Sequence, residues 1–268
     1  GRKWQISLKM NTKNSSQKLA EVLRRYGKIA IAFSGGVDST LLAAAAVKAL
    51  GSENVLLINA VTSFAVDLTG EPDAPLLRLE LNPLDNPEIA ANYPDRCYHC
   101  KKELMGAVCR AARERGFDTV ADGFNKYDLS DYRPGARAAD ELGLVHPFLE
   151  ADMDKDDIRA LSREYGLPNW DAPADACLAS RIPYHTPITA ELLDRIRVAE
   201  QKFRALGFRG HRVRAFGNEA RLELQQRDFA LVAGRRQQML DILAEAGFTR
   251  MLLDLQGYRR GSLNTPTP

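Results

Sequence analysis

The sequence predicts an α/β fold, a doubly wound parallel sheet with a smaller C-terminal α+β domain. Three observations lead to this expectation. Short apolar runs alternate with helix-forming runs from residue 15 to residue 165, as in parallel strands joined by right-handed helical crossovers. One apolar run, 29–33, leads directly into a glycine turn and an Ala/Leu-rich stretch, which is typical of a strand–turn–helix unit. After residue 183 the pattern changes to helix, two short strands, helix and strand.

The expected elements follow the chain in this order. In the first part we expect helices at 15–25, 39–50, 97–115, 136–142 and 155–165, and strands at 29–33, 55–60, 76–81 and 119–121. In the second part we expect helices at 190–206 and 228–246, and strands at 211–216, 220–225 and 250–255. The pattern therefore predicts an N-terminal extension at 1–14, a nucleotide-binding domain at 15–182, and a small α+β domain at 183–268.

One connection in the first domain is short. Between Val61 and Pro75 the chain offers too few residues for a helical crossover, which usually needs a dozen or more. We hypothesise a mobile excursion here, or a segment missing from the chain between Val61 and Asp73.

The strands of the second domain carry alternating charges. A period of two puts Arg212 and Arg214 on one face of their strand. Arg221 and Glu223 share a face of the next strand, while its leucines point into the core. These faces either form one charged surface with a binding role or are a solvated face of the sheet.

Composition limits the classes of function. The 268 residues are 45% hydrophobic with a formal net charge of +2, which indicates a folded protein without the overall positive field of a nucleic-acid-binding protein. No apolar stretch reaches the roughly 20 residues that span a bilayer, and the first residues lack a signal-peptide core. Four cysteines, two of them in a Cys-x-x-Cys pair, favour a reducing compartment. We therefore expect a cytoplasmic protein without membrane contact.

The run from Ser34 to Ser39, Ser-Gly-Gly-Val-Asp-Ser, predicts a phosphate site. Gly35 and Gly36 let the backbone approach an anion, and the first N–H groups of the following helix have no intrahelical partner. Ser34 and Ser39 add hydroxyl groups, and Asp38 could orient the loop or reach Mg²⁺. The alternative is an ordinary βα turn. The run is similar to the PP-loop of ATP pyrophosphatases, and this resemblance implies cleavage of ATP to AMP and pyrophosphate, with adenylation of a substrate oxygen.

The cysteines suggest the nucleophile. Cys97 and Cys100 lie three positions apart at an expected helix start, where neighbouring cations would favour thiolates. Taken alone, this pair could be half a zinc site, a redox pair or two packed thiols. Cys109 fits the apolar stripe of the same helix and is expected in the core. Cys177 lies in a proline-bounded loop beside Arg181, where it is either a reactive thiolate or an inert thiol.

Several motifs together resemble one family. They are Ser34-Gly-Gly-Val-Asp-Ser39, Arg96-Cys-Tyr-His-Cys-Lys101, Asp122-Gly-Phe-Asn125, Asp131-Tyr-Arg-Pro-Gly135, Cys177-Leu-Ala-Ser-Arg-Ile-Pro183 and Gly257-Tyr-Arg-Arg-Gly261. In this order they are similar to LarE, a family of ATP-dependent sulfur transferases that help to build the nickel-pincer nucleotide cofactor. The resemblance implies a pyridinium-3,5-biscarboxylic acid mononucleotide substrate, whose carboxylates are adenylated and become thiocarboxylates.

The resemblance also implies roles for the cysteines. Cys177 matches the family's sulfur-bearing cysteine, whose C–S bond breaks in the sacrificial version of the reaction. Cys97 and Cys100 match the extra cysteines of members that hold a [4Fe-4S] cluster through three thiolates. We favour the cluster version, in which the open iron holds hydrosulfide from a sulfide donor.

Further site residues follow from the resemblance, which places the substrate site at the domain junction. The substrate would be held by Arg181, Arg212 and Arg214. A divalent ion would be bound by Glu200, Glu223 and Asp228. Adenosine or Mg²⁺ would contact Asn125 and Asp128. For each carboxylate, a surface ion pair with arginine is the competing interpretation.

The resemblance further implies a homo-oligomer, which we expect to be a hexamer. Three alternatives stay open: a tRNA-thiolating PP-loop enzyme, an amidating ligase, and a nucleotide sensor without catalysis. The modest net charge and the small C-terminal domain count against the tRNA enzyme.

Overall fold

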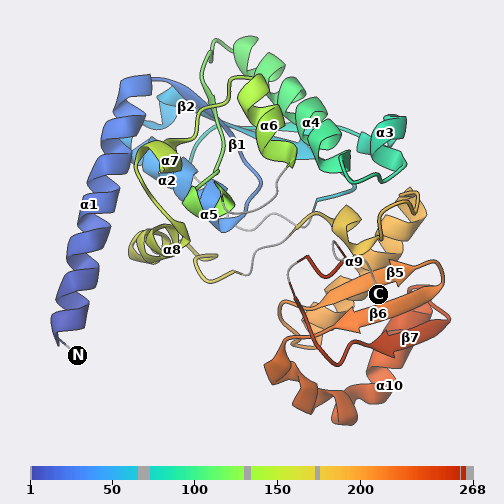
Figure 1. Cartoon of the computed structure of the whole chain (residues 1–268). Coiled ribbons are helices and arrows are strands. Elements are labelled where there is room, and N and C mark those ends of the chain that lie inside the picture. Colours follow the sequence, from blue (N-terminus) through green and yellow to red (C-terminus); the bar gives the residue numbers. More distant parts are fainter. Residues whose placement is uncertain (1, 66–72, 130–133, 173–175, 260, 264–268) are drawn as a thin grey trace. The chain divides into compact units, whose positions relative to one another are not determined.

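The computed structural model describes residues 2–65, 73–129, 134–172, 176–259 and 261–263 (Figure 1). The chain forms two compact units. Unit 1 consists of Gly1–Thr62, Asp67–Leu81 and Cys97–Asp175, and unit 2 of Ser63–Val66, Asn82–Arg96 and Ala176–Pro268.

Unit 1 is built on a parallel sheet. Its strands are β1 (Ile29–Ala32), β2 (Val55–Val61), β3 (Leu76–Glu80) and β4 (Val120–Ala121), and their order in the sheet is β3-β2-β1-β4. All three strand pairs are parallel, with Ala30 opposite Leu56 on one side and Val120 on the other. The carboxyl ends of β1 and β4 therefore lie side by side at one edge of the sheet, where α/β folds place their ligands.

Helices cover both faces of this sheet. The helices of unit 1 are α1 (Arg2–Tyr26), α2 (Val37–Leu50), α4 (Arg96–Arg113), α5 (Lys126–Leu129), α6 (Pro134–Glu141), α7 (Pro147–Glu150) and α8 (Lys155–Glu164). Ile29 and Ile31 pack with side chains of α1, α2 and α8, whereas Ala30 packs with side chains of α4 and α6. This alternation is the period of two expected for a strand buried on both faces.

Unit 2 has its own small sheet. Strands β5 (Arg212–Phe216) and β6 (Glu219–Glu223) form an antiparallel hairpin, and β7 (Arg250–Leu253) pairs parallel to β6. Helices α9 (Ala190–Ala205) and α10 (Phe229–Glu245) contact each other, and α9 also packs on β5. An earlier short helix, α3 (Pro87–Ala90), belongs to this unit as well.

The remaining regular segments are single turns of 3-10 helix. They are η1 (Ser52–Asn54), η2 (Pro83–Asp85), η3 (Leu178–Arg181) and η4 (Gln226–Asp228). Within the described residues, no helix is both long enough and apolar enough to cross a membrane.

The predicted fold class is confirmed, and every expected helix and strand is present within a few residues, apart from the first helix. That helix begins at Arg2, so the residues predicted as an N-terminal extension belong to α1. The predicted division at 182/183 differs from the two units, because segment 82–96 belongs to unit 2 and the last segment of that unit begins at Ala176. The hypothesis for the connection from Val61 to Asp73 lies largely outside the described residues.

The interpretation of the β5–β6 charges as a solvated face is wrong. Arg212, Arg214 and Glu223 are all buried, and Leu222 and Leu224 lie in the core as expected.

Candidate functional site

The glycine turn after β1 forms a compact loop at the start of α2. Gly35 has a φ of +74°, a left-handed conformation that a residue with a side chain adopts only with strain. Gly36 is the N-cap of α2, and no side-chain hydrogen bond caps the helix there in the described structure. The Ser39 hydroxyl lies 3.2 Å from the Ser34 hydroxyl and donates to the Gly36 carbonyl at 3.2 Å. The predicted loop residues are thus brought together, with helix N–H groups available to an anion.

Two residues outside the predicted loop fix its position. The side-chain amide of Asn169 is buried and donates to the Gly35 carbonyl at 3.0 Å and to the Thr40 hydroxyl at 3.1 Å. Gly123, in the loop after β4, approaches so closely that a Cβ built on it would lie 2.8 Å from the Asp38 Cβ. The loops after β1 and β4 therefore touch beside the N-terminus of α2.

Asp38 has a cationic partner. Lys155 Nζ lies 2.6 Å from both carboxylate oxygens of Asp38, although the two residues are 117 positions apart in the sequence. Sequence reasoning gave Asp38 a role but did not identify Lys155, because an isolated lysine at a helix start carries no spacing signal.

Asp122 follows β4 and forms a charged cluster. It accepts a hydrogen bond from Lys101 Nζ at 2.9 Å and is paired with His146 Nδ1 at 2.8 Å. Burial alone would raise the pKa of Asp122, but Lys101 and His146 lower the pKa well below its usual range. The hydrogen bond to Asp122 in turn raises the pKa of His146, despite its partial burial.

The cysteine pair lies at the start of α4. Cys97 and Cys100 are half-buried, and Lys101, the next residue, connects this helix to Asp122 beside the loop after β1. The cations expected to favour thiolates, Arg96, Lys101 and Lys102, all have oxygen partners. Arg96 donates to the Ala179 carbonyl at 3.2 Å, Lys101 pairs with Asp122, and Lys102 pairs with Glu141. Cys109 is buried in the core of unit 1, as predicted.

Cys177 is exposed and precedes the 3-10 turn η3 in unit 2. The buried side chain of Arg181 holds the backbone just before this turn. Its Nη1 donates to the Ala176 carbonyl at 2.6 Å and to the Cys177 carbonyl at 3.2 Å. The other two nitrogen atoms form a bidentate ion pair with Glu200: Nε donates to Oε1 at 3.0 Å and Nη2 donates to Oε2 at 2.9 Å. Arg181, predicted to hold substrate, is completely buried and positions the cysteine loop.

A second buried pair lies next to it. Arg214 donates to the Ser180 carbonyl at 3.0 Å and to Glu223 at 2.7 Å, and Glu223 also accepts a hydrogen bond from Ser262 at 2.7 Å. Arg214 Nε is buried and has no hydrogen-bond partner in the described part of the chain. Arg212 donates to the His211 carbonyl, and its guanidinium lies over the Tyr258 ring.

Comparison with known proteins shows the family. No family model matches the chain. It is 39% identical to an uncharacterized protein of Synechocystis over 92% of this chain and 97% of that protein. It is 36% identical, over 92% of both chains, to the pyridinium-3,5-bisthiocarboxylic acid mononucleotide synthase of Lactiplantibacillus plantarum. An uncharacterized protein of Methanocaldococcus jannaschii is 28% identical over 87% of this chain.

The chain belongs to the LarE family. The resemblance read from the motifs is therefore confirmed over nearly the whole length of the chain.

The carboxylates expected to bind a divalent ion in this LarE protein have other partners. Burial would raise the pKa of Glu200, but the ion pair with Arg181 lowers it. Glu223 is engaged with Arg214 and Ser262, and Asp228 lies at the start of α10 beside Arg227. Within each unit, the described residues contain no group of three or more His, Cys, Asp or Glu side chains arranged to hold a metal ion. The competing interpretation of an ion pair with arginine is confirmed for Glu200 and Glu223, although both pairs are buried and not on the surface. Asp228 lies 3.8 Å from the exposed Arg227, as that interpretation expects.

Asn125 and Asp128 organise the first turn of α5. The Asn125 side chain accepts the Tyr127 N–H at 3.0 Å, and Asp128 accepts the Asn125 N–H at 3.2 Å. These bonds are those of a helix cap, so the structure gives both residues a local role. A contact with adenosine or Mg²⁺ stays a prediction.

Sequence reasoning missed three residues of this LarE protein's site, His146, Lys155 and Asn169, and did not give Lys101 its partner Asp122. Their partners are distant in the sequence, so only the fold brings them to the loops after β1 and β4. The Asp122-Gly-Phe-Asn motif gave the one available signal, because it contains the carboxylate and the glycine that meet there.

Proposed function

We propose that this protein is an ATP-dependent sulfur transferase that forms AMP and pyrophosphate. It adenylates the carboxylates of pyridinium-3,5-biscarboxylic acid mononucleotide and converts them to thiocarboxylates for nickel-pincer nucleotide synthesis. One observation carries the proposal: the start of α2, which suits a pyrophosphate group, is tied through Gly123, Asp122 and Lys101 to the helix that carries the Cys97–Cys100 pair. The printed name of the Lactiplantibacillus relative supports the choice of substrate.

In this proposal the N–H groups at the start of α2 and the hydroxyls of Ser34 and Ser39 grip the pyrophosphate part of ATP. Asp38 serves Mg²⁺, whose ligands are oxygens. Arg212 and Arg214 serve the anionic groups of the substrate, and the buried Nε of Arg214 is a donor that a substrate oxygen could satisfy. Arg181 holds the loop that presents Cys177.

For the sulfur source we propose a [4Fe-4S] cluster held by Cys97, Cys100 and Cys177. The donor chemistry fits, because thiolates are the usual ligands of such clusters and two of the three lie one helical turn apart. The cluster would supply an iron position for hydrosulfide. The alternative is transfer of the Cys177 sulfur itself, which leaves dehydroalanine.

A turnover experiment tests the reaction. The protein is purified without oxygen and incubated with ATP, Mg²⁺, the biscarboxylic mononucleotide and sulfide. We expect AMP, pyrophosphate and a product of thiocarboxylate mass in matching amounts, and a large loss of all three in Asp38→Asn. Transfer RNA in place of the mononucleotide is the control substrate. Thiolation of the RNA and not of the mononucleotide would contradict the proposal.

Iron content and intact mass distinguish the two sulfur routes. We expect labile iron and sulfide in the anaerobic protein, lost in Cys97→Ala and Cys100→Ala but kept in Cys109→Ala, because Cys109 is a core residue. We also expect an unchanged protein mass after turnover. Loss of one H₂S from Cys177 in an iron-free protein would establish the sacrificial route instead.

We also propose a cytoplasmic location and a homo-oligomer, with a hexamer as the expected form. Light scattering of the anaerobic protein gives the oligomer's mass directly.

A further inference from the structure

Lys155 lies beside the proposed ATP site. It is the first residue of α8, and its ammonium lies 2.6 Å from both oxygens of Asp38 in the second position of α2. The two side chains are 24% and 30% exposed, so the pair is reachable from solvent. A ligand at the start of α2 could therefore meet the ammonium.

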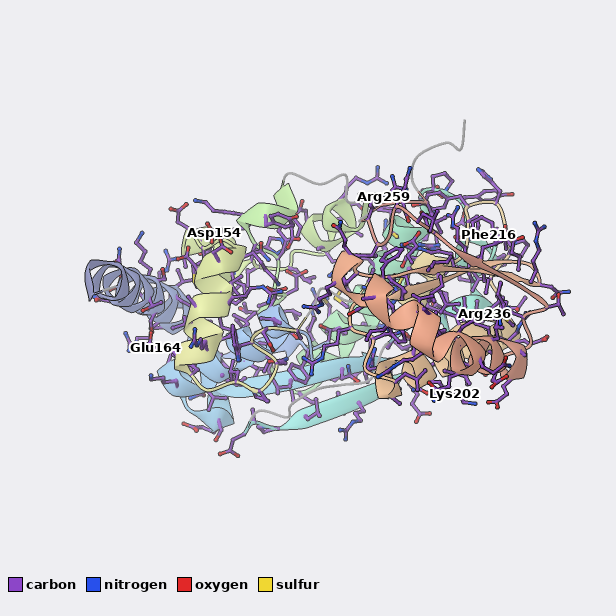
Figure 2. The ribbon with its side chains drawn as sticks, turned by 90° about the horizontal axis from the view of Figure 1, so that it is seen from below. Asp154, Glu164, Lys202, Phe216, Arg236 and Arg259 are labelled. Atoms are coloured by element: carbon purple, nitrogen blue, oxygen red, sulfur yellow. The ribbon has the colours of Figure 1, made fainter. Side chains whose placement is uncertain are left out.

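The architecture fixes Lys155 at this place. Helix α8 packs against α1 and α2 through buried residues including Ile158 and Leu161. Its first turn is closed by a capping box between Asp154 and Asp157. Figure 2 labels Asp154 and Glu164 at the two ends of this helix. The position of the lysine backbone thus does not depend on the ion pair.

The ion pair is partly exposed, so its contribution to the stability of the fold is modest. Pairs between solvent-accessible side chains contribute about 0–1 kcal/mol to folding. The loop that contains Asp38 is already fixed by Asn169 and by the close approach of Gly123. A role in ligand binding accounts for the lysine better.

Electrostatics points to a phosphate ligand. The carboxylate of Asp38 stands at the N-terminal end of α2, where the N–H groups favour a second anion but the carboxylate repels it. An ammonium on that carboxylate removes the repulsion. Lysine has three N–H donors on a flexible stem, so Nζ can donate to a phosphate oxygen and to Asp38, or leave Asp38 to a metal ion.

We propose that Lys155 is a direct ligand of the pyrophosphate part of the nucleotide. Its Nζ donates to a phosphate oxygen at the start of α2 when ATP or pyrophosphate binds. The inference rests on the proposed function, since it takes the loop after β1 as the ATP site.

Calorimetric titration with inorganic pyrophosphate, ATP–Mg²⁺ and AMP tests this role. We expect Lys155→Met to weaken the binding of pyrophosphate and ATP by about ten- to a hundredfold, as for the loss of a charge-assisted hydrogen bond, and to leave AMP binding nearly unchanged. Lys48→Met is the matched control, because Lys48 lies at the other end of α2 with its ammonium over the Tyr165 ring. Should Lys155→Met fail to fold, Lys155→Gln replaces it.

A second comparison separates direct contact from simple neutralisation of Asp38. The effect of Lys155→Met on pyrophosphate binding is measured again in an Asp38→Asn protein, without divalent ions. If Lys155 contacts pyrophosphate directly, Lys155→Met still weakens pyrophosphate binding in this background. Two results would overturn the inference. One is that Lys155→Met no longer weakens pyrophosphate binding in the Asp38→Asn protein, and the other is that wild type and Lys155→Met bind pyrophosphate equally well. Failure of the wild-type protein to bind ATP and pyrophosphate is a different result, which overturns the proposed function as well.

Discussion

At the scale of single residues, buried charges are the main feature of unit 2. The guanidinium of Arg181 is completely buried, and each of its three nitrogen atoms has an oxygen partner on Glu200 or in the Cys177 loop. Removing one partner of such a pair leaves an uncompensated charge in the interior, which costs far more than the pair contributes. The pair therefore acts as a constraint on the geometry of the cysteine loop.

We predict that Arg181→Met destabilises unit 2 by about 3–5 kcal/mol, because the Glu200 carboxylate is left buried without its cation. Amide hydrogen exchange in β5 and β6 measures this. The double variant Arg181→Met with Glu200→Gln should recover part of the loss. Equal exchange in wild type and the single variant would contradict the prediction.

The close packing of Gly123 against the start of α2 leads to a second prediction. A methyl group there would lie 2.8 Å from the Asp38 Cβ and 3.3 Å from the Ser39 nitrogen, so Gly123→Ala must displace the loop after β1. We expect ATP binding, measured by calorimetry, to weaken by at least about tenfold, or roughly 1.4 kcal/mol. In the control Gly106→Ala, the nearest atom is the mobile end of Arg110 at 3.5 Å, so binding should stay unchanged.

At the scale of elements, the loop after β4 connects three parts of unit 1. Asp122 pairs with Lys101 from α4 and with His146 at the start of α7, and the next residue touches the start of α2. The ion pairs of Asp122 therefore hold α4, the helix that carries Cys97 and Cys100, beside the proposed phosphate site.

This cluster should make the stability of unit 1 depend on pH. The folded-state pKa of His146 is raised by Asp122, so its contribution is complete below the ordinary value of about 6.5 and is lost as pH rises through the raised pKa. We expect the free energy of unfolding to fall over that range by at most about 1.4 kcal/mol per pH unit, the limit for one proton. His146→Gln should remove this slope. Tryptophan fluorescence reports it, because Trp4 and Trp170 both belong to unit 1.

At the scale of the whole molecule, the chain passes between the two units several times. Segment 82–96 belongs to unit 2, and Asn92 fastens it there. The Asn92 side chain is buried and donates to the carbonyls of Pro183 and Thr186 at 2.8 and 2.9 Å. Its backbone φ of +59° lies in the left-handed region, which asparagine tolerates better than most residues.

We predict that Asn92→Ala destabilises unit 2 by about 2–4 kcal/mol, through lost hydrogen bonds and a strained backbone, and leaves unit 1 unchanged. Asn92→Gly keeps the backbone conformation, so it should lose less. Hydrogen exchange resolved by segment measures both units at once. A uniform loss of protection across units 1 and 2 would contradict the prediction.

The sequence by itself determined the α/β class, the positions of most helices and strands, the loop at Ser34–Ser39, the core position of Cys109 and the LarE family. These depend on local periodicity, on glycine conformation and on motifs of adjacent residues, all of which are present in the linear chain.

Only the tertiary structure decided how the charges are paired. It showed Lys155 on Asp38, Lys101 and His146 on Asp122, and Arg181 and Arg214 as buried partners of glutamates. These partners lie between 9 and 117 positions apart. An ion pair needs nearness in space and has no period or spacing in the sequence, so the chain has to fold before its charges have partners.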